Sequence, residues 1–134
     1  FGGNVIVSRL PDKSLRTHSY AQYHRRTRAL AAALQRLGLK KGERVATLSW
    51  NHHAHLECYF GIPAAGGVMH TLNLRLAPDE IGWIAGNAKD RFLLVDDILL
   101  PAAPRAWCIR TARPSCTRWA VAWATTGGFA AATC

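Results

Sequence analysis

Short apolar runs alternate with longer segments in the middle of the chain. Three runs are almost continuously apolar: residues 45–48, 68–72 and 91–95. Such runs are typical of strands covered on both faces. Residues 54–65 and 78–87 lie between them and are long enough for helices. Strands that alternate with helices of this length indicate parallel pairing and right-handed crossovers, so the sequence predicts an α/β fold.

The N-terminal part predicts a hairpin followed by a helix. Residues 4–8 and 15–17 flank a turn at residues 11–14. Ser19 and Gln22 have the spacing of a capping box, which predicts that a helix begins here. Its expected apolar stripe is Tyr20, Tyr23, Leu30, Leu34 and Leu37. Its expected solvent-facing arginines are Arg25, Arg26, Arg28 and Arg36. Gly38 suits the left-handed position that follows a helix.

Length and charge narrow the class of protein. The chain has 134 residues, enough for one domain, and a formal net charge of +9. No apolar run approaches the roughly 20 residues that span a bilayer, and no signal-like segment precedes the fold, so we expect a cytoplasmic protein without a membrane span. Because the first residue is Phe1, we expect the natural start to lie upstream.

The last quarter of the chain differs in composition. Residues 102–134 carry four arginines and three of the four cysteines, but no Lys, Asp or Glu. They follow neither a helical nor a strand period. The sequence therefore predicts an irregular tail, which is either disordered or read in a shifted frame. The alternative frames of the underlying DNA test the second explanation.

Three groups of polar residues are candidate sites. His52 and His55 have the spacing of two metal ligands on a helix, near Glu57 and Cys58, but no third ligand is evident and no Cys-x-x-Cys pair occurs. We therefore predict no metal site. The cluster at residues 24–28 is basic, but it lacks interleaved aromatic residues, so we predict no nucleic-acid binding.

The third group follows the predicted strands. Asn51, His70, Thr71 and Asn73 lie in two loops at the carboxyl ends of strands, where open parallel sheets bind ligands. They either line a cleft or tie loop backbone together, and the second role is the commoner one for these residue types.

Several spaced motifs occur in one order along the chain. They are residues 55–57 (HLE), 59–63 (YFGIP), 70–73 (HTLN), 75–76 (RL) and 94–96 (LVD), preceded by residues 19–20 (SY), 30–34 (LAAAL) and 38–45 (GLKKGERV). Together they resemble the N-terminal region of medium- and long-chain fatty-acyl-CoA synthetases, which are adenylate-forming AMP-binding enzymes. The resemblance covers about residues 4–101. It implies a domain at residues 1–101 that forms part of a three-layer α/β structure, with a sheet between two layers of helices. It also implies a separate tail at residues 102–134.

The resemblance also implies a reaction. ATP and Mg activate a fatty acid to an acyl-adenylate, and the thiol of coenzyme A then displaces AMP. This chemistry requires a phosphate-binding loop, an acid for magnesium and a catalytic lysine, all of which lie further along the chains of that family. Residues 124–128 (ATTGG) superficially match such a loop but lack the flanking Ser-Gly and Pro-Lys. We therefore predict a fragment without catalytic, cofactor-binding or metal residues, inactive alone.

Two alternatives from other classes stay open. One is a small basic module that binds anionic partners through residues 25–36 and the arginine tail. The other is an interaction or homodimerisation fragment, because a truncated parallel sheet leaves an edge and an apolar face uncovered.

Overall fold

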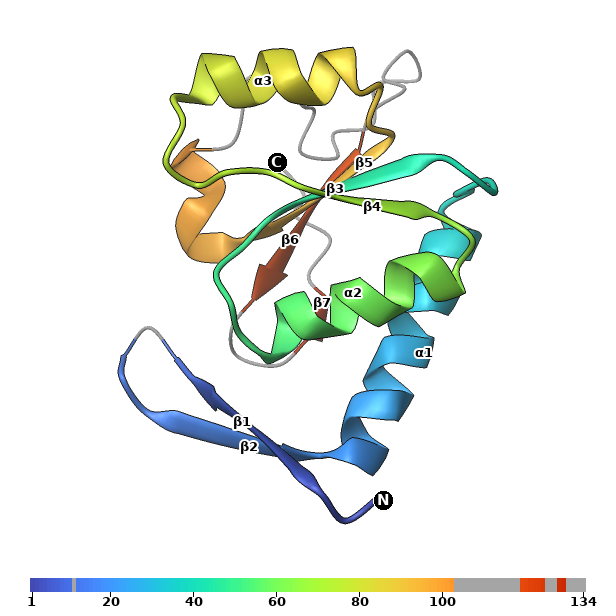
Figure 1. The fold of residues 1–134 in the computed structure, drawn as a ribbon, viewed down its shortest axis with the longest axis vertical. Helices are drawn as coiled ribbons and strands as arrows, with labels where there is room; N and C mark the ends of the chain where they lie inside the picture. The colour runs from blue at the N-terminus through green and yellow to red at the C-terminus, as the bar shows by residue number, and fades with distance from the viewer. Residues whose placement is uncertain (11, 103–118, 125–127, 130–134) are drawn as a thin grey trace. The chain divides into compact units, whose positions relative to one another are not determined.

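The computed structural model describes residues 1–10, 12–102, 119–124 and 128–129 (Figure 1). The chain divides into two compact units. The first unit comprises Phe1–Gly42 and Asn51–Gly67, and the second comprises Glu43–Trp50 and Val68–Cys134. No helix in the described part of the chain is long and apolar enough to cross a membrane.

The first unit begins with the predicted hairpin. Strands β1 (Val5–Arg9) and β2 (Leu15–Ser19) pair antiparallel. The side chains of β1 alternate regularly, with Val5 and Val7 exposed and Ile6 and Ser8 on the inner face, where Ser8 is buried. The inner face of the hairpin therefore presents a buried hydroxyl, as well as an apolar side chain, to the rest of this unit.

Helix α1 (Tyr20–Arg36) begins at the predicted capping box. The backbone N–H of Gln22 donates to Ser19 Oγ at 3.2 Å, and Gln22 Oε1 accepts from the N–H of Ser19 at 2.8 Å. The helix ends before Gly38, which has a φ of 86°. The buried stripe of α1 consists of Thr27, Leu30, Ala31 and Leu34. Tyr20 was expected in this stripe but is 45% exposed.

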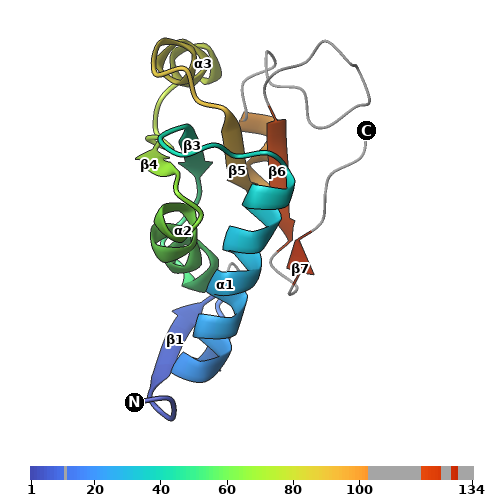
Figure 2. The same ribbon diagram turned by 90° about the vertical axis from the view of Figure 1, so that its right-hand side faces the viewer.

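Helix α2 (His53–Ala64) lies beside α1 (Figure 2). The close approach depends on Gly61, where a Cβ would lie 2.8 Å from Leu30 Cδ2 and 3.2 Å from the carbonyl oxygen of Thr27. Cys58 is buried on α2, as expected of a small core residue. The helix runs into Gly66, whose φ of 91° explains why glycine follows it.

The Gly61→Ala variant is expected to be less stable by about 1 kcal/mol. Overpacking a core costs about 1–3 kcal/mol, and the better helix propensity of alanine offsets part of it. The shift in urea midpoint measures the loss. Gly3→Ala is the matched control, because nothing lies within 4 Å of its added Cβ. An unchanged midpoint for Gly61→Ala would show that the two helices are not closely packed here.

The second unit is built on a parallel sheet. Strands β3 (Arg44–Leu48), β4 (Val68–Thr71) and β5 (Phe92–Asp96) lie in the order β4-β3-β5. Ala46 is opposite His70 on one side and Leu93 on the other, and both pairings are parallel. The predicted α/β fold and parallel pairing are confirmed. The three-layer arrangement stays a prediction, because α1 and α2 belong to the other unit.

Helix α3 (Pro78–Asn87) covers one face of this sheet. Its first turn follows the sequence signals, with Pro78 at the start and Glu80 accepting the backbone N–H of Ala77 at 2.9 Å. The core beneath it consists of Ala46, Leu48, Leu72, Ile81, Ala85, Leu93 and Val95. The period of two on β3 and β5 thus directs alternate residues to this face.

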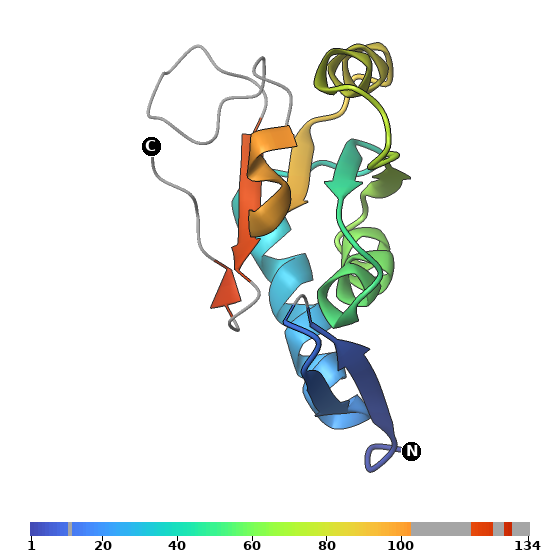
Figure 3. The same cartoon turned by 90° about the vertical axis from the view of Figure 1, so that its left-hand side faces the viewer.

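The chain continues after β5 into a 3-10 helix, η1 (Asp97–Ala102). Two further strands lie in the segment that was predicted to be irregular. Strand β6 (Trp119–Ala124) pairs parallel with β5 and lies beside η1 (Figure 3), and β7 (Gly128–Phe129) pairs antiparallel with β6. Sequence WAVAWA is an unbroken apolar run with aromatic and β-branched residues, which favours a strand. The prediction missed this local signal because it judged the tail as a whole.

Candidate functional site

A pocket in the first unit is lined by three buried polar residues, Ser8, His53 and His55. It has a volume of about 280 Å³ and lies between β1 and the start of α2. The lining residues are Ile6, Val7, Ser8, Arg9, Asn51, His52, His53, His55, Leu56 and Tyr59. Neither aspartate nor glutamate is among them.

Two hydrogen bonds form at the start of α2, and one of them joins it to the hairpin. The backbone N–H of His53 donates to Ser8 Oγ at 2.8 Å, so the buried serine of β1 satisfies a free amide of the helix. His52 is the N-cap, and its Nδ1 accepts the backbone N–H of Ala54 at 3.2 Å. His52 thus acts in helix capping, with a side chain that sequence reasoning considered as a metal ligand.

His53 is the most deeply placed titratable group in the pocket. It is 3% exposed, and its ring stacks on that of His18 from β2 at a centroid distance of 4.5 Å. Burial, followed by the nearby charges of His18, His52, Arg26 and Arg16, lowers the pKa of His53 to about 4. The pKa of His18 is also lowered, by burial and by the two arginines. Both imidazoles are therefore neutral at pH 7.

Neither ring nitrogen of His53 has a hydrogen-bond partner among the described residues. Buried polar side chains are normally hydrogen-bonded, so the unpartnered imidazole of His53 costs this unit stability. His55 is buried as well, and its ring is tilted against Tyr59 at a centroid distance of 5.1 Å.

A buried ion pair joins helices α1 and α2. Arg26 Nε donates to Glu57 Oε1 at 2.6 Å, and the Glu57 side chain is 1% exposed. Burial raises the pKa of Glu57, whereas the hydrogen bond and charge of Arg26 lower it. Tyr23 adds a bond from its hydroxyl to the carbonyl oxygen of Leu56 at 3.0 Å. Arg26 therefore faces inward, unlike Arg25 and Arg28. The prediction that this arginine faces solvent is wrong.

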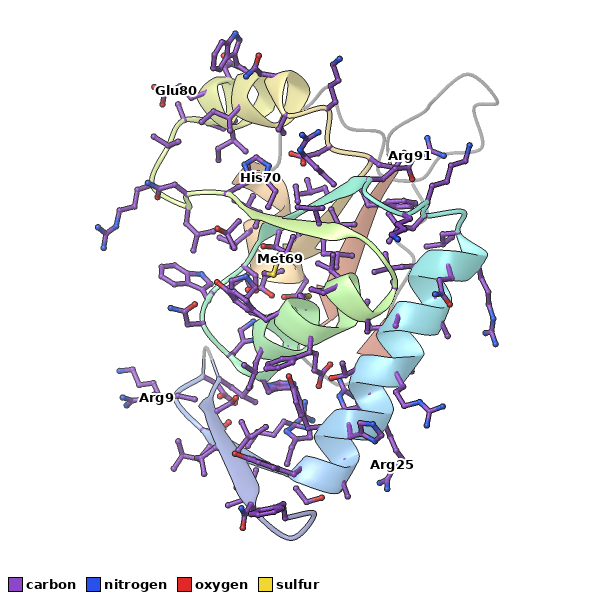
Figure 4. All side chains as sticks on the ribbon, turned by 45° about the vertical axis from the view of Figure 1, so that its right-hand side comes forward. Arg9, Arg25, Met69, His70, Glu80 and Arg91 are labelled. Carbon is purple, nitrogen blue, oxygen red and sulfur yellow. The ribbon has the colours of Figure 1, made fainter. Side chains whose placement is uncertain are left out.

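The second unit holds a different pair. His70 Nδ1 lies 2.8 Å from Asp90 Oδ2, and the Asp90 side chain is fully buried. Figure 4 shows His70 on β4, on the side of the sheet that α3 covers. The pair links the end of α3 to β4.

The edge of the sheet where β3 and β5 end is tied by Asp96. Its Oδ2 accepts the backbone N–H of Trp50 at 2.9 Å, and its side chain is buried. Because Leu48 is opposite Val95, the two strands end level and their following loops emerge at the same edge. Sequence reasoning named Asp96 only as part of the LVD motif at residues 94–96, although an acid at the end of an apolar run is a signal for this role.

The four residues predicted to line a cleft fall in both units. Asn51 belongs to the first unit and lines the pocket, whereas His70, Thr71 and Asn73 belong to the second. Asn73 Oδ1 accepts the backbone N–H of Arg75 at 3.0 Å, so this residue ties loop backbone together. That the four share a cleft stays a prediction.

Within the described ranges, no three His, Cys, Asp or Glu side chains come together as metal ligands. Residues 125–127 of the ATTGG segment lie outside the described residues, as do Cys108, Cys116 and Cys134 of the tail. Sequence reasoning missed the pocket because its contacts join β1 to α2 across 45 positions, as in the bond from His53 to Ser8.

Comparison with known proteins identifies what the chain is similar to. Residues 3–125 match the family described as AMP-binding enzyme. The match continues past residue 101, where sequence reasoning ended the resemblance, and it includes β6.

Two curated relatives align with about the same part of the chain. A long-chain-fatty-acid–CoA ligase of Thermus thermophilus is 46% identical over 101 residues, which are 75% of this chain and 19% of that protein. A medium-chain-fatty-acid–CoA ligase of Ectopseudomonas oleovorans is 36% identical over 100 residues, covering 75% of this chain and 18% of the relative. The chain thus spans about a fifth of the length of these relatives.

A solved structure supports the same likeness. The inhibitor-bound N-terminal domain of FACL13 from Mycobacterium tuberculosis superposes with a TM-score of 0.69 at 25% identity, covering 81% of this chain and 27% of that one.

Proposed function

Since the chain belongs to the AMP-binding enzyme family, we propose that it forms the N-terminal scaffold of an ATP-dependent fatty-acyl-CoA synthetase. The observation that carries the proposal is the 46% identity to the Thermus ligase over 101 residues, in a segment that folds as a parallel β4-β3-β5 sheet. The synthetase would activate a fatty acid with ATP and Mg and transfer the acyl group to coenzyme A.

The scaffold role follows from where the strands end. In open parallel sheets, ligands bind beyond the carboxyl ends of the strands. Asp96 holds the loop after β3 through the backbone of Trp50, and this bond fixes one margin of that edge. We assign these loops to the wall of the cleft in which the acyl-adenylate forms.

None of the residues is assigned to ATP, magnesium or coenzyme A. A phosphate site needs a glycine- and hydroxyl-rich loop followed by a lysine, and residues 124–128 are followed by Phe129 and alanines instead. The residues present do not fit these groups, so the chain is proposed to be inactive alone. The same proposal includes a domain boundary near residue 101, a cytoplasmic location and a homodimer. Sedimentation of the purified chain tests the homodimer.

A chimeric enzyme tests the scaffold role. Residues 1–101 of this chain replace the aligned segment of the Thermus ligase, and fatty-acid-dependent exchange between pyrophosphate and ATP is measured. We expect the chimera to retain exchange within about tenfold of the parent, because a correctly shaped scaffold leaves the reactive groups in place.

The matched control carries Leu93→Asp in the same chimera. Leu93 is fully buried in β5, so a charge there disrupts the sheet and abolishes exchange. A folded chimera without any exchange would contradict the proposed function.

A further inference from the structure

The hairpin of β1 and β2 buries little apolar surface of its own. Val5, Val7 and Leu15 are exposed on its outer face, whereas on the inner face Ile6 is partly buried and Ser8 is buried. A single two-stranded hairpin is marginally stable in water. The hairpin therefore depends for its order on contacts with the helices of the first unit.

One of these contacts is a stack of two imidazole rings. The ring of His18 on β2 lies against that of His53 on α2, with a centroid distance of 4.5 Å and an interplanar angle of 23°. Both ring nitrogens of His53 and Nδ1 of His18 are buried without a hydrogen-bond partner among the described residues. The backbone N–H of His53 also donates to Ser8 Oγ of β1 at 2.8 Å. Both strands of the hairpin thus contact the start of α2 at His53.

The surroundings of the stack disfavour a proton on either ring. The charged and titratable groups that act on His53 come from three elements: Arg16 and His18 on β2, Arg26 on α1 and His52 on α2. Glu57 lies one turn further along α2, but its Oε1 is bonded to Arg26 at 2.6 Å. An added proton would therefore be placed beside positive charges, at a buried nitrogen that water does not reach.

We propose that the hairpin is a pH-sensitive switch, which protonation of His18 and His53 releases from α2 while α1 and α2 stay folded. The released rings gain access to water, and the backbone N–H of His53 loses its bond to Ser8. The proposal concerns the fold of this chain by itself and does not depend on the synthetase assignment.

The bonds that hold the two helices do not involve the hairpin strands. The start of α1 is held by its capping box, in which the N–H of Gln22 donates to Ser19 Oγ at 3.2 Å. The two helices are joined by the ion pair of Arg26 with Glu57 and by the close approach of Gly61 to α1. The hairpin can therefore turn away at the junction of β2 and α1 without separating the helices.

The direction and range of the switch follow from the two histidines. Burial lowers the pKa of His53 to about 4, and burial and the two arginines lower the pKa of His18. A histidine with a lowered folded pKa stabilises the docked state above its unfolded value and loses that contribution as the pH falls. Docking should weaken from pH 6.5 to about 4. Through His53 alone, the equilibrium for release should rise about twentyfold from pH 7 to pH 5.

Amide hydrogen exchange, measured by NMR at pH 7 and pH 5 over a series of low urea concentrations, tests the proposal. After correction for intrinsic exchange rates, we expect the protection of the His53 N–H to fall about twentyfold between the two pH values. Its exchange should depend weakly on urea, because release exposes little surface, whereas the buried Leu30 of α1 should exchange through global unfolding with a strong urea dependence. The N–H of Gln22, bonded within α1, is the control and should keep its protection.

A double variant separates protonation from other effects of acid. His18→Phe with His53→Phe keeps two aromatic rings in the stack and should show no fall in protection of the residue 53 amide. His24→Phe alters an exposed histidine of α1 and should show the same fall as the wild type. If the double variant does not fold, the urea series on the wild type decides alone.

The proposal is overturned if the His53 and Leu30 amides have the same urea dependence at pH 5, because the hairpin would then open only when the whole unit unfolds. It is equally overturned if the protection of the His53 amide is unchanged between pH 7 and pH 5, or if a folded double variant shows the same fall as the wild type.

Discussion

Replacing Arg26 with methionine is expected to lower the free energy of unfolding by about 3 kcal/mol at pH 7, because it leaves a buried carboxylate without its cation. Glu57 is 1% exposed, and its Oε1 lies 2.6 Å from Arg26 Nε. Its other oxygen, Oε2, is buried without a partner among the described residues. Urea unfolding measures the loss.

The loss should depend on pH in a defined direction. Burial raises the pKa of Glu57, and the hydrogen bond and charge of Arg26 offset part of that rise. A carboxyl whose folded pKa lies above its unfolded value contributes most stability at low pH and loses it as the pH rises through the folded pKa. Arg26→Met raises the folded pKa further, so its stability should approach that of the wild type below the unfolded pKa of about 4.

The double variant Arg26→Met with Glu57→Gln is the control. Without the carboxylate, the pH-dependent part of the loss should disappear. A loss of equal size at pH 4 and pH 7 in the single variant would show that Arg26 acts through packing alone.

Acidification from pH 7 to pH 5 is expected to remove about 2 kcal/mol of stability through His53. Its folded pKa is about 4, below the unfolded value of 6.5. A histidine with a lowered folded pKa stabilises the fold above its unfolded pKa and loses that contribution as the pH falls toward the folded value. The affected window is therefore pH 6.5 to about 4.

His53→Phe keeps an aromatic ring against His18 and should abolish this part of the pH dependence. His24→Phe alters an exposed histidine of α1 and is expected to retain it. The free energy of unfolding of each variant is measured at pH 7 and pH 5. An equal loss of unfolding free energy between pH 7 and pH 5 in the wild type and in His53→Phe would contradict the neutral, buried state of His53.

Most element boundaries could be predicted because local chemistry sets them. Ser19 and Gln22 begin α1, Pro78 begins α3, and Gly38 and Gly66 follow helix ends with positive φ. The start of α2 was expected one residue later, because histidine is an uncommon N-cap and its role depends on the ring of His52.

The candidate site could not be predicted from periodicity. Val5, Ile6 and Val7 are all apolar, so a period of two does not decide which face of β1 turns inward; in the structure Val5 and Val7 are exposed and Ser8 is buried. The reason is a long-range contact, because Ser8 accepts a hydrogen bond from the first free amide of α2. Likewise, Glu57 belongs to the buried face only through its ion pair with Arg26.

The tail shows a different limit. Trp119–Ala124 forms β6 beside β5, although the surrounding composition suggested no regular structure. An apolar run from a distant part of the sequence can pair with a free edge strand of a parallel sheet. Composition judged over the whole tail concealed that six-residue signal.

The central claim is that the chain has the scaffold of an adenylate-forming enzyme without the groups that handle phosphate. The most direct test is fatty-acid-dependent exchange of labelled pyrophosphate into ATP, measured for the purified chain alone with magnesium present. We expect the rate to equal that of buffer with and without fatty acid. Exchange that rises with fatty acid concentration, and that is lost in the sheet-disrupting Leu93→Asp variant, would contradict the account.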